Sequence, residues 1–247
     1  EIERDEIKPF DFIGFCIFSS GFSFLIFGLS MVNNRITIWI ISFILIFLGF
    51  FLILVYIFKS INYEYPLIDF NVFKIKTFKI CIISGIIFRV GTGSIPFLIP
   101  LMLQLGYEKD AFFSGMVTGI CAFGAVGMKF FAHRILKVFR FKNVLITCSA
   151  ITSLLIISFI IFSKNTPYIV IILFIFVYGC FRSMQIVALN TIVYSDIDQK
   201  NISQATKIDY IAQKISIGMG VSIGGSVLQA SNYFQGHSII VIDYFSI

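Results

Sequence analysis

Long apolar stretches alternate with short polar connectors along the whole chain. Seven of the stretches are 19 to 29 residues long, and a helix of about 20 residues crosses the ~30 Å hydrocarbon core of a bilayer. Strands of membrane barrels need only about 9–11 residues, so these stretches are too long for strands. We therefore predict an all-α membrane protein with about seven transmembrane helices, over residues 11–32, 36–58, 77–105, 112–131, 144–162, 169–194 and 207–234.

The polar connectors divide the chain into four parts. Residues 1–58 are expected to form a two-helix transmembrane hairpin, and residues 77–234 a helical bundle. Between them, residues 59–76 mix apolar and polar positions, which predicts a cytoplasmic amphipathic element on the membrane surface. Residues 235–247 form a tail too short to span. Because the chain begins with Glu1 rather than Met, we expect it to be part of a longer protein.

The composition excludes a soluble domain and argues against binding to nucleic acid. The chain is 58% hydrophobic and 13% charged, with a mean hydropathy of +0.95. Its net charge of +6 lies mostly in the connectors. With the N-terminus in the cytoplasm, twelve Lys and Arg residues fall on the inside and three on the outside. This positive-inside bias fixes the expected orientation and marks the charges as orientation signals in a multi-pass protein.

The third apolar stretch, residues 77–105, contains a cation deep in the membrane. Arg89 lies twelve residues from its start, roughly 18 Å into the bilayer. Such a residue normally faces the interior of a bundle or a wet cavity. A pathway or gating role is therefore expected; the alternative is a structural arginine bonded to helix carbonyls or to a neighbouring acid. The stretch also has four residues expected to thin and bend the helix where it packs: Gly91, Gly93, Pro96 and Pro100.

A polar stripe runs along the sixth stretch, residues 169–194. Tyr178, Arg182 and Gln185 fall within about 60° of one another on a helix, and Asn190 lies on their flank. No acid is predicted at the depth of the two arginines, because Asp209 is placed at the entrance of the last span. The counter-charge is then expected from a missing part of the polypeptide, a helix C-terminus or an anionic substrate.

The last stretch, residues 207–234, combines polar residues with a glycine pair. Gln213 shares one face with Asp209, and Gly220 and Gly224 have the spacing that lets two helices approach closely. Tight packing alone would explain the glycines.

No arrangement of residues indicates an enzyme, a cofactor or a metal site. The chain has two histidines, His133 and His237, and neither belongs to a zinc-binding or nucleophile motif. All five cysteines fall inside apolar stretches without paired spacing, so they are expected to be small buried residues.

Three segments resemble a known family of transporters. The segments are FRVGTGSIPFLIPLMLQ (88–104), AHRILKVFRFK (132–142) and GCFRSMQIVALNT (179–191). They are similar to stretches in the C-terminal half of the fourteen-span drug:proton antiporters of the major facilitator superfamily, closest to the multidrug transporter branch. The resemblance implies a partial major facilitator fold, with the hairpin inserted between the two halves followed by five helices of the C-terminal bundle.

The resemblance also implies a function. It suggests the C-terminal part of a proton-coupled multidrug exporter in the bacterial inner membrane, in contact with lipid and inactive without a six-span N-terminal half. A small-molecule substrate and protons would pass a wall formed by Arg89, Arg182, Gln185, Asn190 and Gln213. The basic loop with Arg134, Lys137 and Arg140 would act in gating, although His133 and Arg140 depart from the family pattern. The alternative is a non-transporting seven-span receptor or scaffold protein.

Overall fold

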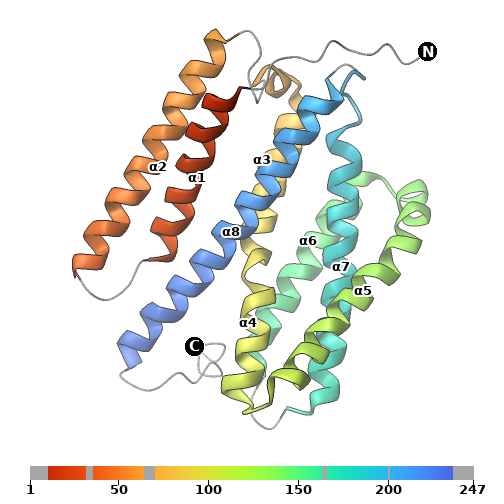
Figure 1. Cartoon of the computed structure of the whole chain (residues 1–247). Coiled ribbons are helices and arrows are strands. Elements are labelled where there is room, and N and C mark those ends of the chain that lie inside the picture. Colours follow the sequence, from red (N-terminus) through yellow and green to blue (C-terminus); the bar gives the residue numbers. More distant parts are fainter. Residues whose placement is uncertain (1–10, 32–35, 64–69, 163–165, 200, 236–247) are drawn as a thin grey trace.

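The computed structural model describes residues 11–31, 36–63, 70–162, 166–199 and 201–235 (Figure 1). Every regular element within these ranges is helical. Seven helical segments are long and apolar enough to cross a membrane: 12–29, 40–60, 76–106, 111–138, 141–161, 168–193 and 202–228. The predicted all-α membrane fold with seven spans is therefore confirmed.

The first two helices, α1 (Phe12–Ser30) and α2 (Ile36–Asn62), form a closely packed hairpin. Glycines set the distance between them: a Cβ atom on Gly49 would lie 2.6 Å from the carbonyl oxygen of Gly21. The hairpin lies at one end of the molecule, and α1 packs against the last helix, α8 (Ile202–Gln235) (Figure 1). The Ser226 hydroxyl donates to the carbonyl of Leu29 across this contact, at 3.2 Å.

An ion pair closes one end of the hairpin. The Asp11 carboxylate caps α1 by accepting from the Gly14 N–H at 2.8 Å, and Lys59 of α2 donates to the same oxygen at 2.8 Å. Burial alone would raise the pKa of Asp11. The hydrogen bonds from Lys59 and Gly14, together with the lysine charge, outweigh that effect and lower the pKa below 3.8.

We expect the pair to stabilise the fold above about pH 4 and to lose its effect as acid protonates Asp11, because the folded pKa lies below the unfolded one. Asp11→Asn should lower the thermal unfolding temperature in detergent at neutral pH. The difference from the unchanged protein should shrink as the pH falls through the lowered pKa. A difference that stays constant or widens in acid would contradict the assignment.

The third span bends where its glycines and prolines lie. It consists of α3 (Lys76–Gly93), α4 (Ile95–Leu101) and a π-helical turn over Met102–Gly106. The break between α3 and α4 falls at Ser94, the N-cap of α4, and Pro96 lies in the first turn of α4. Pro100 lies inside α4, and its carbonyl accepts a hydrogen bond from the Ser114 hydroxyl at 3.3 Å. The helix is thus interrupted in mid-membrane, with neighbouring groups bonding to its exposed carbonyls.

Two tight helix contacts organise the bundle, and small residues make both. Helix α5 (Ala111–Val138) packs along α7 (Tyr168–Val193), where a Cβ on Gly124 would lie 2.5 Å from the Phe176 carbonyl oxygen. Helix α3 packs along α8, where a Cβ on Gly220 would lie 2.5 Å from the Val90 carbonyl oxygen. Helix α6 (Phe141–Ser158), followed by a 3₁₀ turn over Phe159–Ile161, packs against α7.

The prediction of a basic loop over residues 132–142 is wrong for most of its length. Helix α5 continues to Val138, and α6 begins at Phe141 with Arg140 as its N-cap. Arg134 and Lys137 therefore lie on a helix. The segment has no Gly or Pro to stop α5, and its Ala, Arg, Leu and Lys residues favour a helix.

The connector before α3 contributes a single 3₁₀ turn, Phe70–Lys74. Val72 within it is buried, and the Phe73 ring lies edge-on to Phe78 of α3, with centroids 5.5 Å apart. Residues 59–62 of the predicted surface element belong instead to the end of α2, and residues 64–69 lie outside the described residues.

Candidate functional site

A buried ion pair links α3 to α8 inside the membrane span. The Arg89 guanidinium Nη2 lies 4.0 Å from Asp209 Oδ1, and the two side chains are only 5% and 4% exposed. The prediction that Arg89 lacks an acid at its depth is therefore wrong. Charged pairs are rare within membranes and normally face protein or a wet pathway.

Two features of the local structure bring these residues together. Helix α8 begins at Ile202, so Asp209 lies seven residues, about 10 Å, inside it rather than at its entrance. The Arg89 side chain folds back along α3 over Gly85, where a Cβ atom would lie 2.5 Å from Nη1. Gly85 thus leaves the space in which the guanidinium reaches toward the carboxylate.

Three neutral side chains complete the cluster that we call the Arg89–Asp209 network. The Tyr194 hydroxyl and the Gln213 amide each donate to Asp209 Oδ2 at 2.9 Å. Arg89 donates from Nη2 to Asn190 Oδ1 at 3.3 Å. The network therefore ties α3, α7 and α8 together, with Tyr194 just past the end of α7. Sequence reasoning missed Asp209 and Tyr194 as members of this site.

Arg182 occupies a different place on α7. It lies one turn from Tyr178 and near Cys121 of α5. Its Nε is buried, and so is the Tyr178 hydroxyl; neither atom has a hydrogen-bond partner within the described part of the chain. Arg182 also forms no ion pair there, whereas Arg89 has the Asp209 carboxylate beside it.

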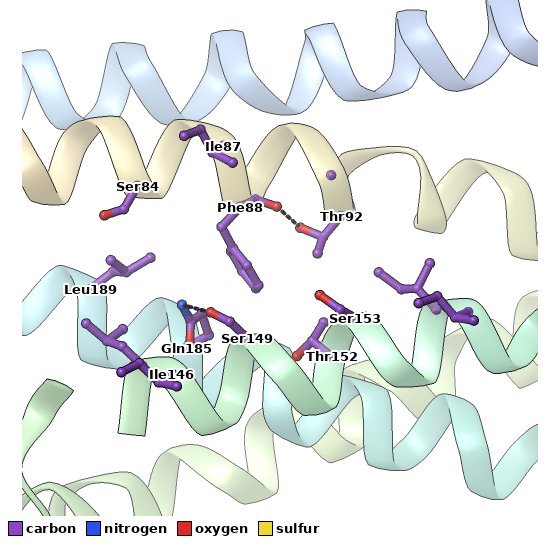
Figure 2. Close-up of a pocket in the computed structure, with 14 residues that line it drawn as sticks. Ser84, Ile87, Phe88, Thr92, Ile146, Ser149, Thr152, Ser153, Gln185 and Leu189 are labelled. Atoms are coloured by element: carbon purple, nitrogen blue, oxygen red, sulfur yellow. Dashed lines mark hydrogen bonds between the residues drawn. The ribbon is translucent and has the colours of Figure 1, made fainter. Parts of the chain in front are cut away.

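Gln185 points toward α6 rather than toward the network. Its side chain is 4% exposed, and its Nε2 donates to Ser149 Oγ at 2.8 Å. Figure 2 shows both residues at a groove between α3 and α6, whose volume is about 740 Å³. Of the five predicted pathway residues, the structure thus brings together Arg89, Asn190 and Gln213, and separates Arg182 and Gln185 from them.

The residues predicted for packing and gating are placed as follows. Gly93 and Gly220 face each other across α3 and α8, and a Cβ on Gly224 would lie 2.5 Å from Cβ of Ser94. Gly91 makes no such contact with any described residue, and Pro96 is exposed.

The side chains of the three basic residues, Arg134, Lys137 and Arg140, are exposed. Within the described ranges, no group of three or more His, Cys, Asp or Glu residues could hold a metal ion.

Comparison with known proteins relates the chain to bacterial transporters. It is 25% identical over 243 residues to "Probable transport protein HsrA" of Haemophilus influenzae, and the match covers 98% of this chain and 52% of that protein. It is 24% identical to a protein named multidrug resistance protein MdtD in Enterobacter sp. (94% of this chain, 49% of that protein). An MdtD protein of Pectobacterium carotovorum is 25% identical (97% and 53%).

The chain spans about half the length of the curated relatives it matches. No family model matches it. The relatives agree with the resemblance carried by residues 88–104, 132–142 and 179–191, and the seven helical spans agree with it as well. Over nearly its whole length, the chain is therefore homologous to bacterial proteins named for transport and multidrug resistance, which confirms the predicted resemblance to the C-terminal part of multidrug transporters of the major facilitator superfamily.

Proposed function

We propose that the chain supplies the C-terminal half of a proton-coupled exporter of small molecules in the bacterial inner membrane. The match to curated transport and multidrug resistance proteins over 94–98% of the chain carries this proposal. The Arg89–Asp209 network supports it, because ionisable groups held inside a bundle mark substrate and ion pathways in transporters.

The five polar residues predicted for the pathway have separate roles in this proposal. Arg89, Asn190 and Gln213 act through Asp209, which couples α3, α7 and α8. Arg182 carries a charge without an acidic partner in the described residues and is the position suited to an anionic group, from substrate or from a second bundle. Gln185 acts through α6, which its amide contacts at Ser149.

Alternating access requires two bundles that rock about a shared site. We propose that this chain works with a six-span N-terminal half, on the same polypeptide or on another, and moves no substrate by itself. The exposed basic residues Arg134, Lys137 and Arg140, at the α5–α6 junction, are proposed to act in gating between the two halves.

A seven-span receptor or scaffold is the competing function. A receptor could also contain seven helices, but the named relatives are transport and resistance proteins. The buried network adds weight to transport, because ionisable residues within transmembrane segments are rare and mark substrate and ion pathways.

Export in cells tests the proposal. The chain, combined with its N-terminal half in a strain lacking its main drug exporters, should raise resistance and lower accumulation of a fluorescent drug. Arg182→Ala should reduce export at least about tenfold, which corresponds to ~1.4 kcal/mol. The matched control is Lys129→Ala, which removes an exposed cation from the neighbouring helix α5. With equal amounts of each variant in the membrane, parental export by Arg182→Ala would remove Arg182 from the pathway.

A further inference from the structure

An apolar pocket of about 310 Å³ lies between the hairpin and the bundle. Helices α1 and α2 form one side of it, α3 and α8 form the other, and Phe73 of the 3₁₀ turn also lines it. The hairpin packs on the bundle mainly through α1 and α8, whereas α2 and α3 make few contacts with each other (Figure 1). The pocket is the space that this one-sided contact leaves beside α3.

The wall of the pocket needs no hydrogen bond from an occupant. Its side chains are apolar apart from Ser216, whose hydroxyl donates to the carbonyl of Ala212 on the same helix. A cavity lined in this way stays dry and accepts apolar molecules. At ~30 Å³ per group, the volume that a water molecule occupies in the liquid, it has room for about ten groups of methylene size.

The depth of the pocket matches the acyl chains of one leaflet. On α3, its lining residues run from Ile82 to Ile86, six to ten residues after the helix begins at Lys76, which is about 9–15 Å. On α1, Phe18 and Phe22 lie equally far from the start at Phe12. Both helices begin at the same end of the molecule (Figure 1), the end that the positive-inside bias assigns to the cytoplasm. The pocket therefore lies within the cytoplasmic leaflet.

One wall of the pocket reaches the lipid-facing surface and carries a cation. Ile83, which lines the pocket, is 46% exposed. Lys79 lies one turn nearer the cytoplasm, within about 60° of Ile82, Ile83 and Ile86 on the helix. It is exposed and forms no ion pair with any described residue, whereas Lys59 of α2 is paired with Asp11. Basic positions at the cytoplasmic ends of transmembrane helices bind anionic lipid headgroups.

We propose that this pocket holds an acyl chain of one anionic phospholipid from the cytoplasmic leaflet, whose headgroup phosphate contacts Lys79. A further helix is excluded by size, because a helix with its side chains is about 10 Å wide. An apolar drug could fill the pocket, but the unpaired cation above it favours an amphiphile with a negative headgroup. The lipid fills the space beside α3 and so fastens the hairpin to the bundle. The proposal concerns lipid binding and does not depend on transport activity.

Labelling with photoreactive phospholipids tests this proposal. The full chain is reconstituted in phosphatidylcholine vesicles that contain a small fraction of phosphatidylglycerol with a photoreactive group in mid-chain. A parallel sample contains phosphatidylcholine with the same photoreactive chain, so the two probes differ only in the headgroup. After irradiation, mass spectrometry identifies the labelled residues. Phe22 and Ile86 report the pocket, and Phe47 of α2, which is 73% exposed, reports ordinary contact with the bilayer.

The phosphatidylglycerol probe should label Phe22 and Ile86 several-fold more than the phosphatidylcholine probe, with equal labelling of Phe47. Lys79→Gln should lower this preference about fivefold, which is the effect of one lysine near an anionic membrane surface. Its matched control is Lys142→Gln, which removes an exposed cation from α6, away from the pocket. The exposed position of Lys79 makes misfolding of the variant an improbable cause of the change.

Filling the pocket gives a second comparison. Ala212→Phe places a ring in the pocket and should lower labelling of its wall by both probes. Ala122→Phe adds the same ring at an exposed position on α5 and should leave the labelling unchanged. Label confined to lipid-facing residues, equal labelling of the pocket by both headgroups, or displacement of the probe by a transported drug would each overturn the proposal. Loss of transport with the labelling intact would count against the proposed function only.

Discussion

Asp209→Ala should be among the most damaging single substitutions in this protein. It would leave the Arg89 guanidinium, which is 5% exposed, buried without its acid. Removing one partner of a buried ion pair typically costs 3–5 kcal/mol, because the remaining charge stays desolvated. Arg89→Met should be harmful for the matching reason, since the Asp209 carboxylate would retain only its neutral donors, Tyr194 and Gln213.

The double variant Arg89→Met with Asp209→Leu separates stability from transport. Replacing both charges with apolar groups removes the desolvation penalty, so the double variant should be more stable than either single variant. Unfolding measured in detergent micelles or bicelles gives the three free energies. Export should stay low in all three variants, because the restored packing does not restore the charges. If the loss of unfolding free energy in the double variant equals the sum of the losses in the two single variants, the two residues do not act as a pair.

Gly124→Ala should disrupt the contact between α5 and α7. The added methyl group would lie 2.5 Å from the Phe176 carbonyl oxygen and 3.2 Å from the Cys180 sulfur. Backbone cannot move aside as a flexible side chain can, so the two helices must separate. Overpacking of this kind costs about 1–3 kcal/mol, and the loss of contact along α7 would also shift Asn190 relative to Arg89.

Gly127→Ala provides the matched control on the same helix. A Cβ at Gly127 would meet no described atom within 4 Å, so the same substitution adds no clash. Replacing this glycine should leave stability unchanged or raise it by roughly 0.4–1 kcal/mol through lower chain entropy. Thermal unfolding of both variants in the same detergent gives the comparison. Equal effects at the two positions would show that packing at Gly124 is not the cause.

Hydrophobic pattern alone was enough to predict the seven spans, because helix length in a membrane is set by the bilayer. The bend of the third span also followed from local chemistry, since Pro96 and Pro100 cannot continue an unbroken backbone ladder. The basic segment differs from the prediction because charged residues do not by themselves end a helix, and α5 extends beyond its apolar part to Val138.

The Arg89–Asp209 network could not be found from linear position. The apolar pattern predicts a span that begins at residue 207 and has Asp209 at its entrance, whereas α8 begins five residues earlier, at Ile202. A comparison of residue depths on separate helices also leaves out the length of the side chains. The Arg89 side chain folds back over Gly85, about one turn along α3. The helical angle predicts one stripe with Tyr178, Arg182 and Gln185, but a stripe can face several neighbours: Gln185 bonds to α6, and Arg182 lies near α5.

Transport in liposomes is the most direct measurement of whether this chain is one half of an exporter. The purified 247-residue chain, with or without a six-span N-terminal half, is reconstituted and given an imposed pH gradient across the membrane. Uptake of a fluorescent drug is then followed over time. We expect no proton-driven drug movement by the chain alone and clear movement when both halves are present. Robust proton-driven transport by the chain alone would contradict this expectation.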